Sequence, residues 1–368
     1  MTERELCIAL NMISGLGCGR YQALLDAFGS PDEIRKAERA DLQQVDGIGK
    51  ILAERIVSFD WDSELSRELA VAERGGVSII TLADDNYPIE LREIFDSPLC
   101  LYIRGNLPEN SDRSVAIVGS RRISKYGEKM ARQLAREAVD CGCTVFSGLA
   151  QGTDTVVHQE VVSASGVTIG VLGSGLMHMY PKDNIPLARD IIRCGGAVIS
   201  EFPLNYPISR HNFPRRNRIV AALCRATIVV EAGLDSGALI TAKLASEIGR
   251  EVFAVPGRVD NPQAKGCLKL IKEGAGLIES FDDVRLAFAS GMHSVELSSQ
   301  TESAEVTANL SDDCRRIYDL LRRKDNDLEG LQELSGMEPG LLMSVLSQLE
   351  FRCLIERDSD FYYRLVRE

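Results

Sequence analysis

The residues best suited to chemistry lie in a short loop, Gly119-Ser120-Arg121, which directly follows an apolar segment at residues 115–118. A glycine lets a ligand approach the backbone, a helix N-terminus favours anions, and a guanidinium pairs with phosphate oxygens. The loop is therefore predicted to bind phosphate. It lacks the second and third glycines of a dinucleotide-binding fingerprint, and the chain contains no Gly-Lys-Ser/Thr sequence of a nucleotide-hydrolysing loop.

Four further loops rich in Gly or Ser follow other apolar segments, at residues 147–154, 173–175, 200–201 and 236–238. If these segments are strands of one parallel sheet, their loops gather at the same edge. One such loop is more often only a turn, but five loops after five strands are not well explained in that way. We expect them to line a single crevice with N–H groups and hydroxyls.

A third feature is the segment Phe213-Pro214-Arg215-Arg216-Asn217-Arg218. Phe213 offers a ring for base stacking, and Asn217 can bond a base or sugar. Arg215 and Arg218 are three residues apart, on one helical face, so they can contact successive phosphates. This pattern is typical of single-strand binding. The alternative is an Arg-rich surface helix with Phe213 in the core.

The net charge of −12 at first argues against nucleic acid as a ligand. The charge is unevenly distributed, however: residues 1–112 hold 11 basic and 21 acidic side chains, residues 113–288 hold 22 and 17, and residues 289–368 hold 9 and 16. Only the middle region is basic. It contains an acid-free stretch at residues 202–230 and a second cluster formed by Arg121, Arg122, Lys125, Lys129, Arg132 and Arg136. A single charge run usually marks a solvated face.

The elements that would position these residues alternate between apolar strands and helices. Strands are expected near 115–118, 145–146, 168–172, 197–199, 228–230 and 252–255, and helices near 124–141, after 154, at 214–224 and at 237–248. Strands without polar alternation, flanked by helices, belong to a buried parallel sheet. The fold class is therefore α/β, with a doubly wound Rossmann-like parallel sheet over residues 67–288 that binds ligands at the switch in strand order.

Two smaller modules flank this sheet. Residues 1–66 are predicted to form a small all-α domain with Gly-x-Gly turns at 15–17 and 47–49, the second of which fits a helix-hairpin-helix; glycines that merely cap helices are the alternative. Residues 289–307 are predicted to be a linker, and residues 308–368 a C-terminal winged-helix domain. Its third helix, at 339–351, contains no Lys or Arg, which favours protein contact over DNA reading.

The remaining composition points to an intracellular protein. The ten cysteines include no Cys-x-x-Cys pair, which predicts free thiols in a reducing cytoplasm, and the four histidines lie far apart, so no metal site is expected. The chain begins with acidic residues where a secretion signal would be basic, and no apolar stretch approaches the length of a membrane span. We expect a cytoplasmic location without membrane contact.

Taken together, the motifs resemble those of the DprA/Smf family of bacterial DNA-processing proteins. They are the segments 116–121, 146–154, 173–181, 200–203, 213–218, 231–242 and 252–257, preceded by a strand-forming extension around Tyr87-Pro88 and Leu101-Tyr102. The resemblance implies a non-catalytic protein without cofactor that binds single-stranded DNA, forms a homodimer and loads the recombinase RecA during natural transformation. One departure is Leu268, where a polar residue is expected after Gly266-Cys267.

The resemblance and the loop positions together select the candidate DNA-binding residues. They are Gly119, Ser120, Arg121, Arg122, Gly148, Gly173, Ser174, Lys182, Phe213, Arg215, Arg216, Asn217, Arg218 and Gly237. No catalytic or metal-binding residue is selected.

Two other functions stay open. One is a Rossmann-like sensor of nucleotide derivatives, or a nucleoside phosphate hydrolase, for which Glu231 and Asp235 are the available carboxylates; the glycine-rich loop of such enzymes is absent from residues 231–237. The other is a purely protein-binding adaptor, which would leave the basic crevice without a role.

Overall fold

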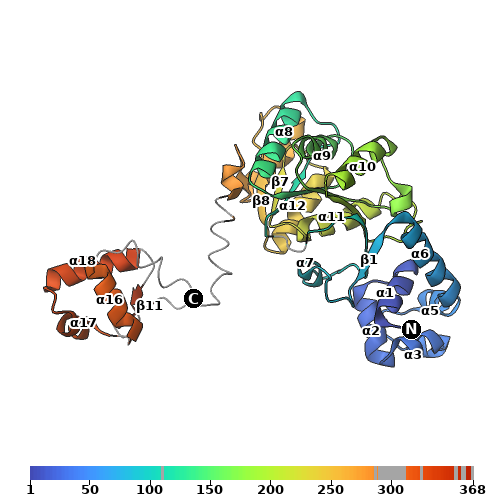
Figure 1. Ribbon diagram of the computed structural model, residues 1–368, viewed down its shortest axis with the longest axis horizontal. Helices are drawn as coiled ribbons and strands as arrows, with labels where there is room; N and C mark the ends of the chain where they lie inside the picture. The colour runs from blue at the N-terminus through green and yellow to red at the C-terminus, as the bar shows by residue number, and fades with distance from the viewer. Residues whose placement is uncertain are drawn as a thin grey trace. The chain divides into compact units, whose positions relative to one another are not determined.

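The computed structural model describes residues 1–108, 112–285, 288, 312–323, 326–351, 355–357 and 362–365 (Figure 1). The chain divides into two compact units, residues 1–288 and 289–368. The predicted linker at 289–307 lies outside the described residues, and the predicted domain end at residue 66 falls inside helix α6 (Trp61–Gly75). The division into domains stays a prediction.

The first unit is built on a nine-stranded sheet with the order β1-β2-β6-β5-β4-β3-β7-β8-β9. The strands are β1 Ser78–Thr81, β2 Cys100–Gly105, β3 Ser114–Val118, β4 Thr144–Ser147, β5 Thr168–Val171, β6 Ala197–Ser200, β7 Ala226–Val229, β8 Glu251–Ala254 and β9 Gly276–Leu277. The pairs from β6 to β9 are parallel, which confirms the doubly wound fold. Strands β1 and β2 add an antiparallel edge, a direction that the sequence did not indicate.

Helices cover both faces of the sheet. They are α8 Lys125–Asp140, α9 Thr153–Ser163, α10 Ile185–Arg193, α11 Asn212–Ala222, α12 Gly237–Glu247 and α13 Lys265–Lys272, with a short α7 Ile89–Arg92 before β2. Successive strand residues pack into different cores, because side chains alternate across a sheet: Val115 and Ile117 pack with the apolar side of α8, and Ala116 and Val118 pack with α11 and α12. Helices α10 and α13 and strand β9 are short and were not identified in the sequence.

Six helices form the N-terminal part: α1 Glu3–Met12, α2 Cys18–Phe28, α3 Pro31–Lys36, α4 Arg39–Leu42, α5 Lys50–Val57 and α6. The two Gly-x-Gly turns precede α2 and α5, and Arg20 joins them by donating to the carbonyls of Gly15 and Gly47 (2.6 and 2.9 Å). Figure 1 shows these helices beside β1, and they share one apolar core with Ile79, Cys100 and Tyr102 of the antiparallel edge.

The second unit contains helices α16 Asp312–Arg323, α17 Leu328–Ser335 and α18 Pro339–Phe351 and a hairpin of β10 Ile355–Arg357 and β11 Tyr363–Leu365. Helix α17 ends at Gly336, whose φ of +65° is the left-handed conformation that glycine adopts most easily. The element order matches the winged-helix prediction, but the assignment of a winged helix stays a prediction.

Candidate nucleic-acid interface

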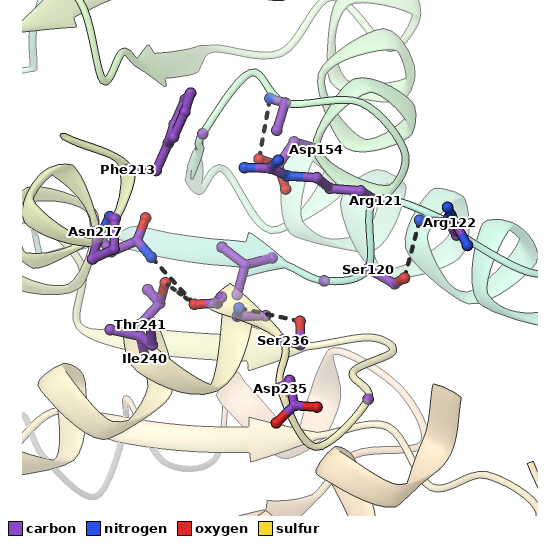
Figure 2. Close-up of a pocket in the computed structure, with 18 of the residues that line it drawn as sticks. Ser120, Arg121, Arg122, Asp154, Phe213, Asn217, Asp235, Ser236, Ile240 and Thr241 are labelled. Carbon is purple, nitrogen blue, oxygen red and sulfur yellow. Dashed lines mark hydrogen bonds between the residues drawn. The ribbon is translucent and has the colours of Figure 1, made fainter. Parts of the chain in front are cut away.

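One cavity of the first unit lies where the strand order reverses. Strand β3, the first strand of the parallel series, has β4 on one side and β7 on the other. A cavity of about 860 Å³ opens there, lined by the loops after β3, β4 and β7, by α11 and by residues around Gln263 (Figure 2). Doubly wound sheets bind ligands at this topological position.

The loop after β3 is held by hydrogen bonds from three directions. The hydroxyl of Ser120 donates to Oε1 of Gln263 (3.0 Å) and accepts from the N–H of Arg122 (3.0 Å), while the N–H and hydroxyl of Thr153 both donate to the Ser120 carbonyl (3.1 Å each). Gly119 packs so closely against Thr153 that a Cβ atom would lie 2.6 Å from its hydroxyl. Ser120 lines the cavity but is largely buried, and its hydroxyl already has two partners within the protein.

Four exposed cations line the cavity: Arg121, Arg122, Arg210 and Lys265. Among the residues that the structure describes, none of the four has a carboxylate within ion-pair distance. Their charge is therefore available to a ligand. Arg121 and Arg122 were selected from the sequence; Arg210 was noted only as part of the acid-free stretch, and no sequence signal singled out Lys265.

Phe213 lines the cavity rather than the core. Its ring is partly exposed, and the guanidinium of Arg121 lies 5.1 Å from the ring centroid, a cation–π distance. Figure 2 shows the Arg121 side chain directed toward Phe213 and Asp154, whereas Arg122 points away from them. A planar aromatic or guanidinium group beside free cations can stack on a nucleobase.

Two acidic side chains also line the cavity. Asp154 is buried and accepts from the N–H of Ala150 (3.2 Å); burial raises the pKa of this carboxyl, and the nearby charge of Arg216 opposes the rise. Asp235 is exposed in the loop after β7. Glu231 is absent from the lining, because its carboxylate accepts from the N–H and the hydroxyl of Ser124 at the start of α8 (2.9 and 2.5 Å).

Arg216 links the ends of two strands and is not free to bind a ligand. It is buried, and its guanidinium donates to the carbonyls of Gly148 (2.6 Å) and Val171 at the ends of β4 and β5. Burial lowers the pKa of Arg216 to about 10. Asn217 continues this network: its oxygen accepts from Nε of Arg216 (3.1 Å) and its amide nitrogen donates to the carbonyl of Gly237 (3.2 Å). Both residues line the cavity, but their polar groups already bind protein.

Arg215 and Arg218 lie outside the lining. Both bind Oε2 of the buried Glu201, at 3.0 and 2.6 Å, and Arg218 also pairs with Asp96 (3.2 Å). Only 11% of the Arg218 side chain is exposed, against 43% of Arg215. Burial raises the pKa of Glu201, and the two guanidiniums oppose the rise. The geometry does not support the expectation that Arg215 and Arg218 form a free phosphate-binding face.

Of the other residues selected from the sequence, some line a cavity and some do not. Gly148 and Gly237 line the cavity beside β3, and Gly173 lines a small adjoining hollow with Arg121, Tyr180 and Phe213. Ser174 is buried and donates to the His178 carbonyl (2.8 Å), while Lys182 is exposed but lies outside both hollows. The structure thus brings nine of the fourteen selected residues to the cavity and Gly173 to the adjoining hollow, and it places Ser174, Lys182, Arg215 and Arg218 outside both.

The described part of the chain contains no candidate metal site. Its His, Cys, Asp and Glu residues include no group arranged to hold a metal ion, and the cysteines it contains are free. None of its helices is long and apolar enough to cross a membrane.

Comparison with known proteins agrees with this architecture. Residues 78–289 match the family model of DNA recombination-mediator protein A, and residues 8–59 match a SAM-like helix-hairpin-helix tandem. The Smf protein of Escherichia coli is 40% identical over 68% of this chain and 67% of its own length.

Two solved structures are also similar. The crystal structure of DNA processing protein A from Streptococcus pneumoniae has a TM-score of 0.66 and 35% identity, over 77% of this chain and 97% of that chain. The Helicobacter pylori protein, described for its mode of binding single-stranded DNA, has a TM-score of 0.51 and 26% identity, over 59% of this chain and 97% of that one. The chain belongs to the DNA recombination-mediator protein A family, whose members include DNA processing protein A and Smf.

Proposed function

We propose that this protein binds single-stranded DNA in the cavity beside β3, with no chemical change to the DNA. The observation that carries the proposal is that Arg121, Arg122, Arg210 and Lys265 line one cavity with the Phe213 ring and have no carboxylate partner among the described residues. Cations neutralise phosphates regardless of sequence, and an exposed ring can stack only on a base that is not paired in a duplex. The binding mode for which the related Helicobacter pylori protein is described supports the same ligand.

Family membership supports a wider role. We propose that the bound strand is delivered to the recombinase RecA during transformation or recombination, and that the protein acts as a homodimer in the cytoplasm. Light scattering of the purified chain tests the dimer. The RecA step is tested by measuring RecA filament formation on strands already covered by single-strand binding protein, with and without this protein.

A second candidate is binding or hydrolysis of a nucleotide derivative. The cavity has the size of a small-molecule site and contains the exposed carboxylate of Asp235. The other carboxylate considered from the sequence, Glu231, already accepts hydrogen bonds from Ser124, so of these two only Asp235 is left for hydrolysis. Incubation with nucleoside monophosphates tests this function, since release of free base would establish it.

The DNA proposal is tested by titrating single- and double-stranded oligonucleotides of one sequence against the wild type and Phe213→Ala. We expect the wild type to prefer the single strand and the variant to lose that preference, because stacking contributes roughly 1–3 kcal/mol per base. Equal affinity of the wild type for both forms would contradict the proposal. A circular dichroism spectrum controls for folding of the variant.

A further inference from the structure

Helix α8 presents a row of cations that begins at the cavity. Lys125, Lys129, Arg132 and Arg136 follow one another at intervals of four, three and four residues, which places them along one face of the helix. The row starts three residues after Arg122, whose side chain leads away from Arg121 and Phe213 (Figure 2).

The structure divides this row into two halves. Arg132 pairs with Glu128 (2.9 Å) and Glu160 (3.4 Å), and Arg136 with Asp140 (3.8 Å). Lys125 and Lys129 are exposed, and neither has an ion-pair partner within the described part of the chain. The charges on the first turns of α8 are therefore available, while those further along are neutralised.

Two carboxylates close to the lysines in sequence or space already have other hydrogen-bond partners. Glu128, between Lys125 and Lys129 in sequence, accepts two hydrogen bonds from Arg132 (2.9 and 3.2 Å). Glu231 holds the residue just before Lys125 through the N–H and hydroxyl of Ser124 (2.9 and 2.5 Å). Neither carboxylate pairs with a lysine, although each is close in sequence or space.

An aromatic ring lies among these cations. The side chain of Tyr126 is 47% exposed, and its hydroxyl donates to the carbonyl of Pro256 (2.9 Å). The ring is thus held at both ends while much of its surface stays open. Tyr126 precedes Lys129 by three residues, so both lie on the same side of α8.

We propose that the single strand bound in the cavity leaves it past Arg122 and continues over the first two turns of α8, with Lys125 and Lys129 contacting phosphates and Tyr126 contacting a base. This inference rests on the proposed binding of single-stranded DNA in the cavity. It adds a second section to the binding surface and predicts that the section ends before Arg132, where the cations acquire carboxylate partners.

The test measures the affinity of two double variants and one single variant for two oligothymidylates. The short one, of about six nucleotides, fills the cavity, and the long one, of about twenty, also reaches α8. The variants are Lys125→Ala/Lys129→Ala, the matched control Arg132→Ala/Arg136→Ala, which removes the same charge from the same helix, and Arg121→Ala in the cavity. Kd is measured at several salt concentrations, and circular dichroism confirms folding.

We expect the lysine variant to bind the long strand roughly tenfold more weakly and the short strand normally. Its salt slope on the long strand should fall by roughly 0.7 for each lost phosphate contact. The arginine control should resemble the wild type. Unchanged binding of the long strand, an equal loss on both strands, or an equal loss in the control would overturn the second section. Normal binding of the short strand by Arg121→Ala would instead overturn the proposed cavity function.

Discussion

Two pairs of arginines that look alike in the sequence have opposite surroundings in the fold. Arg121 and Arg122 follow β3, are exposed and have no carboxylate partner among the described residues. Arg215 and Arg218 lie on α11 and share the buried carboxylate of Glu201 at the end of β6. The first pair can bind a phosphate at once, whereas the second would have to break an ion pair.

The difference shows that a basic stretch of sequence reveals where positive charges are, but not whether they are free to bind a ligand. The segment at residues 202–230 contains no acidic residue, so its arginines looked available for phosphate binding. Their carboxylate partner, Glu201, directly precedes this segment and reaches Arg218 only in the folded protein. We therefore assign ligand binding to the free arginines and a positioning role to the paired ones. The following variants separate the two roles.

The largest effect on stability is expected from Glu201→Ala. Loss of this carboxylate leaves Arg218 buried without its main partner, which should lower the free energy of unfolding by about 3 kcal/mol. Urea denaturation followed by circular dichroism measures the change. The control Asp96→Ala removes the half-exposed partner of the same arginine and should cost at most about 1 kcal/mol. Equal losses in the two variants would show that Glu201 has no special structural role.

The next effect on stability concerns His158 on the buried side of α9 and depends on pH. His158 is buried, its Nδ1 bonds the hydroxyl of Thr168 (2.7 Å), and burial together with the charge of Arg216 lowers the pKa of His158 to about 3. The unfolded chain takes up this proton near pH 6.5, so it binds more protons than the folded chain at pH 5. Between pH 8 and pH 5, His158 alone should reduce the free energy of unfolding by about 2 kcal/mol.

Urea denaturation at both pH values in the wild type and His158→Gln measures this contribution. The variant should lose less stability than the wild type on acidification. If both chains show the same pH dependence, His158 does not stay neutral in the fold.

A smaller effect distinguishes two glycines that were both selected as ligand contacts. A Cβ on Gly148 would lie 2.3 Å from a nitrogen of Arg216, whereas a Cβ on Gly237 would meet no atom within 4 Å. Gly148→Ala should therefore cost roughly 1–3 kcal/mol of stability and weaken DNA binding, because Arg216 must move. Gly237→Ala should change stability by no more than about 0.5 kcal/mol. The reverse order would contradict the placement of Arg216.

The sequence predicted the sheet, its main helices and the position of the cavity, because these depend on apolar segments and on the glycines that follow them. It also identified Arg121 and Phe213. It could not divide the arginines into free and paired, since Glu201 and Asp96 reach Arg218 from different elements. Gln263 lies in a short 3-10 helix after β8 and Lys265 begins α13, and nothing in their local sequence links them to Ser120.

The central claim is tested most directly by the salt dependence of single-strand binding in Arg121→Ala and Arg218→Ala. For Arg121→Ala we predict weaker binding and a slope of log K against log salt that is shallower by roughly 0.7, as for one lost phosphate contact. For Arg218→Ala we predict reduced stability with the wild-type slope. An unchanged slope in Arg121→Ala together with a shallower one in Arg218→Ala would contradict the account.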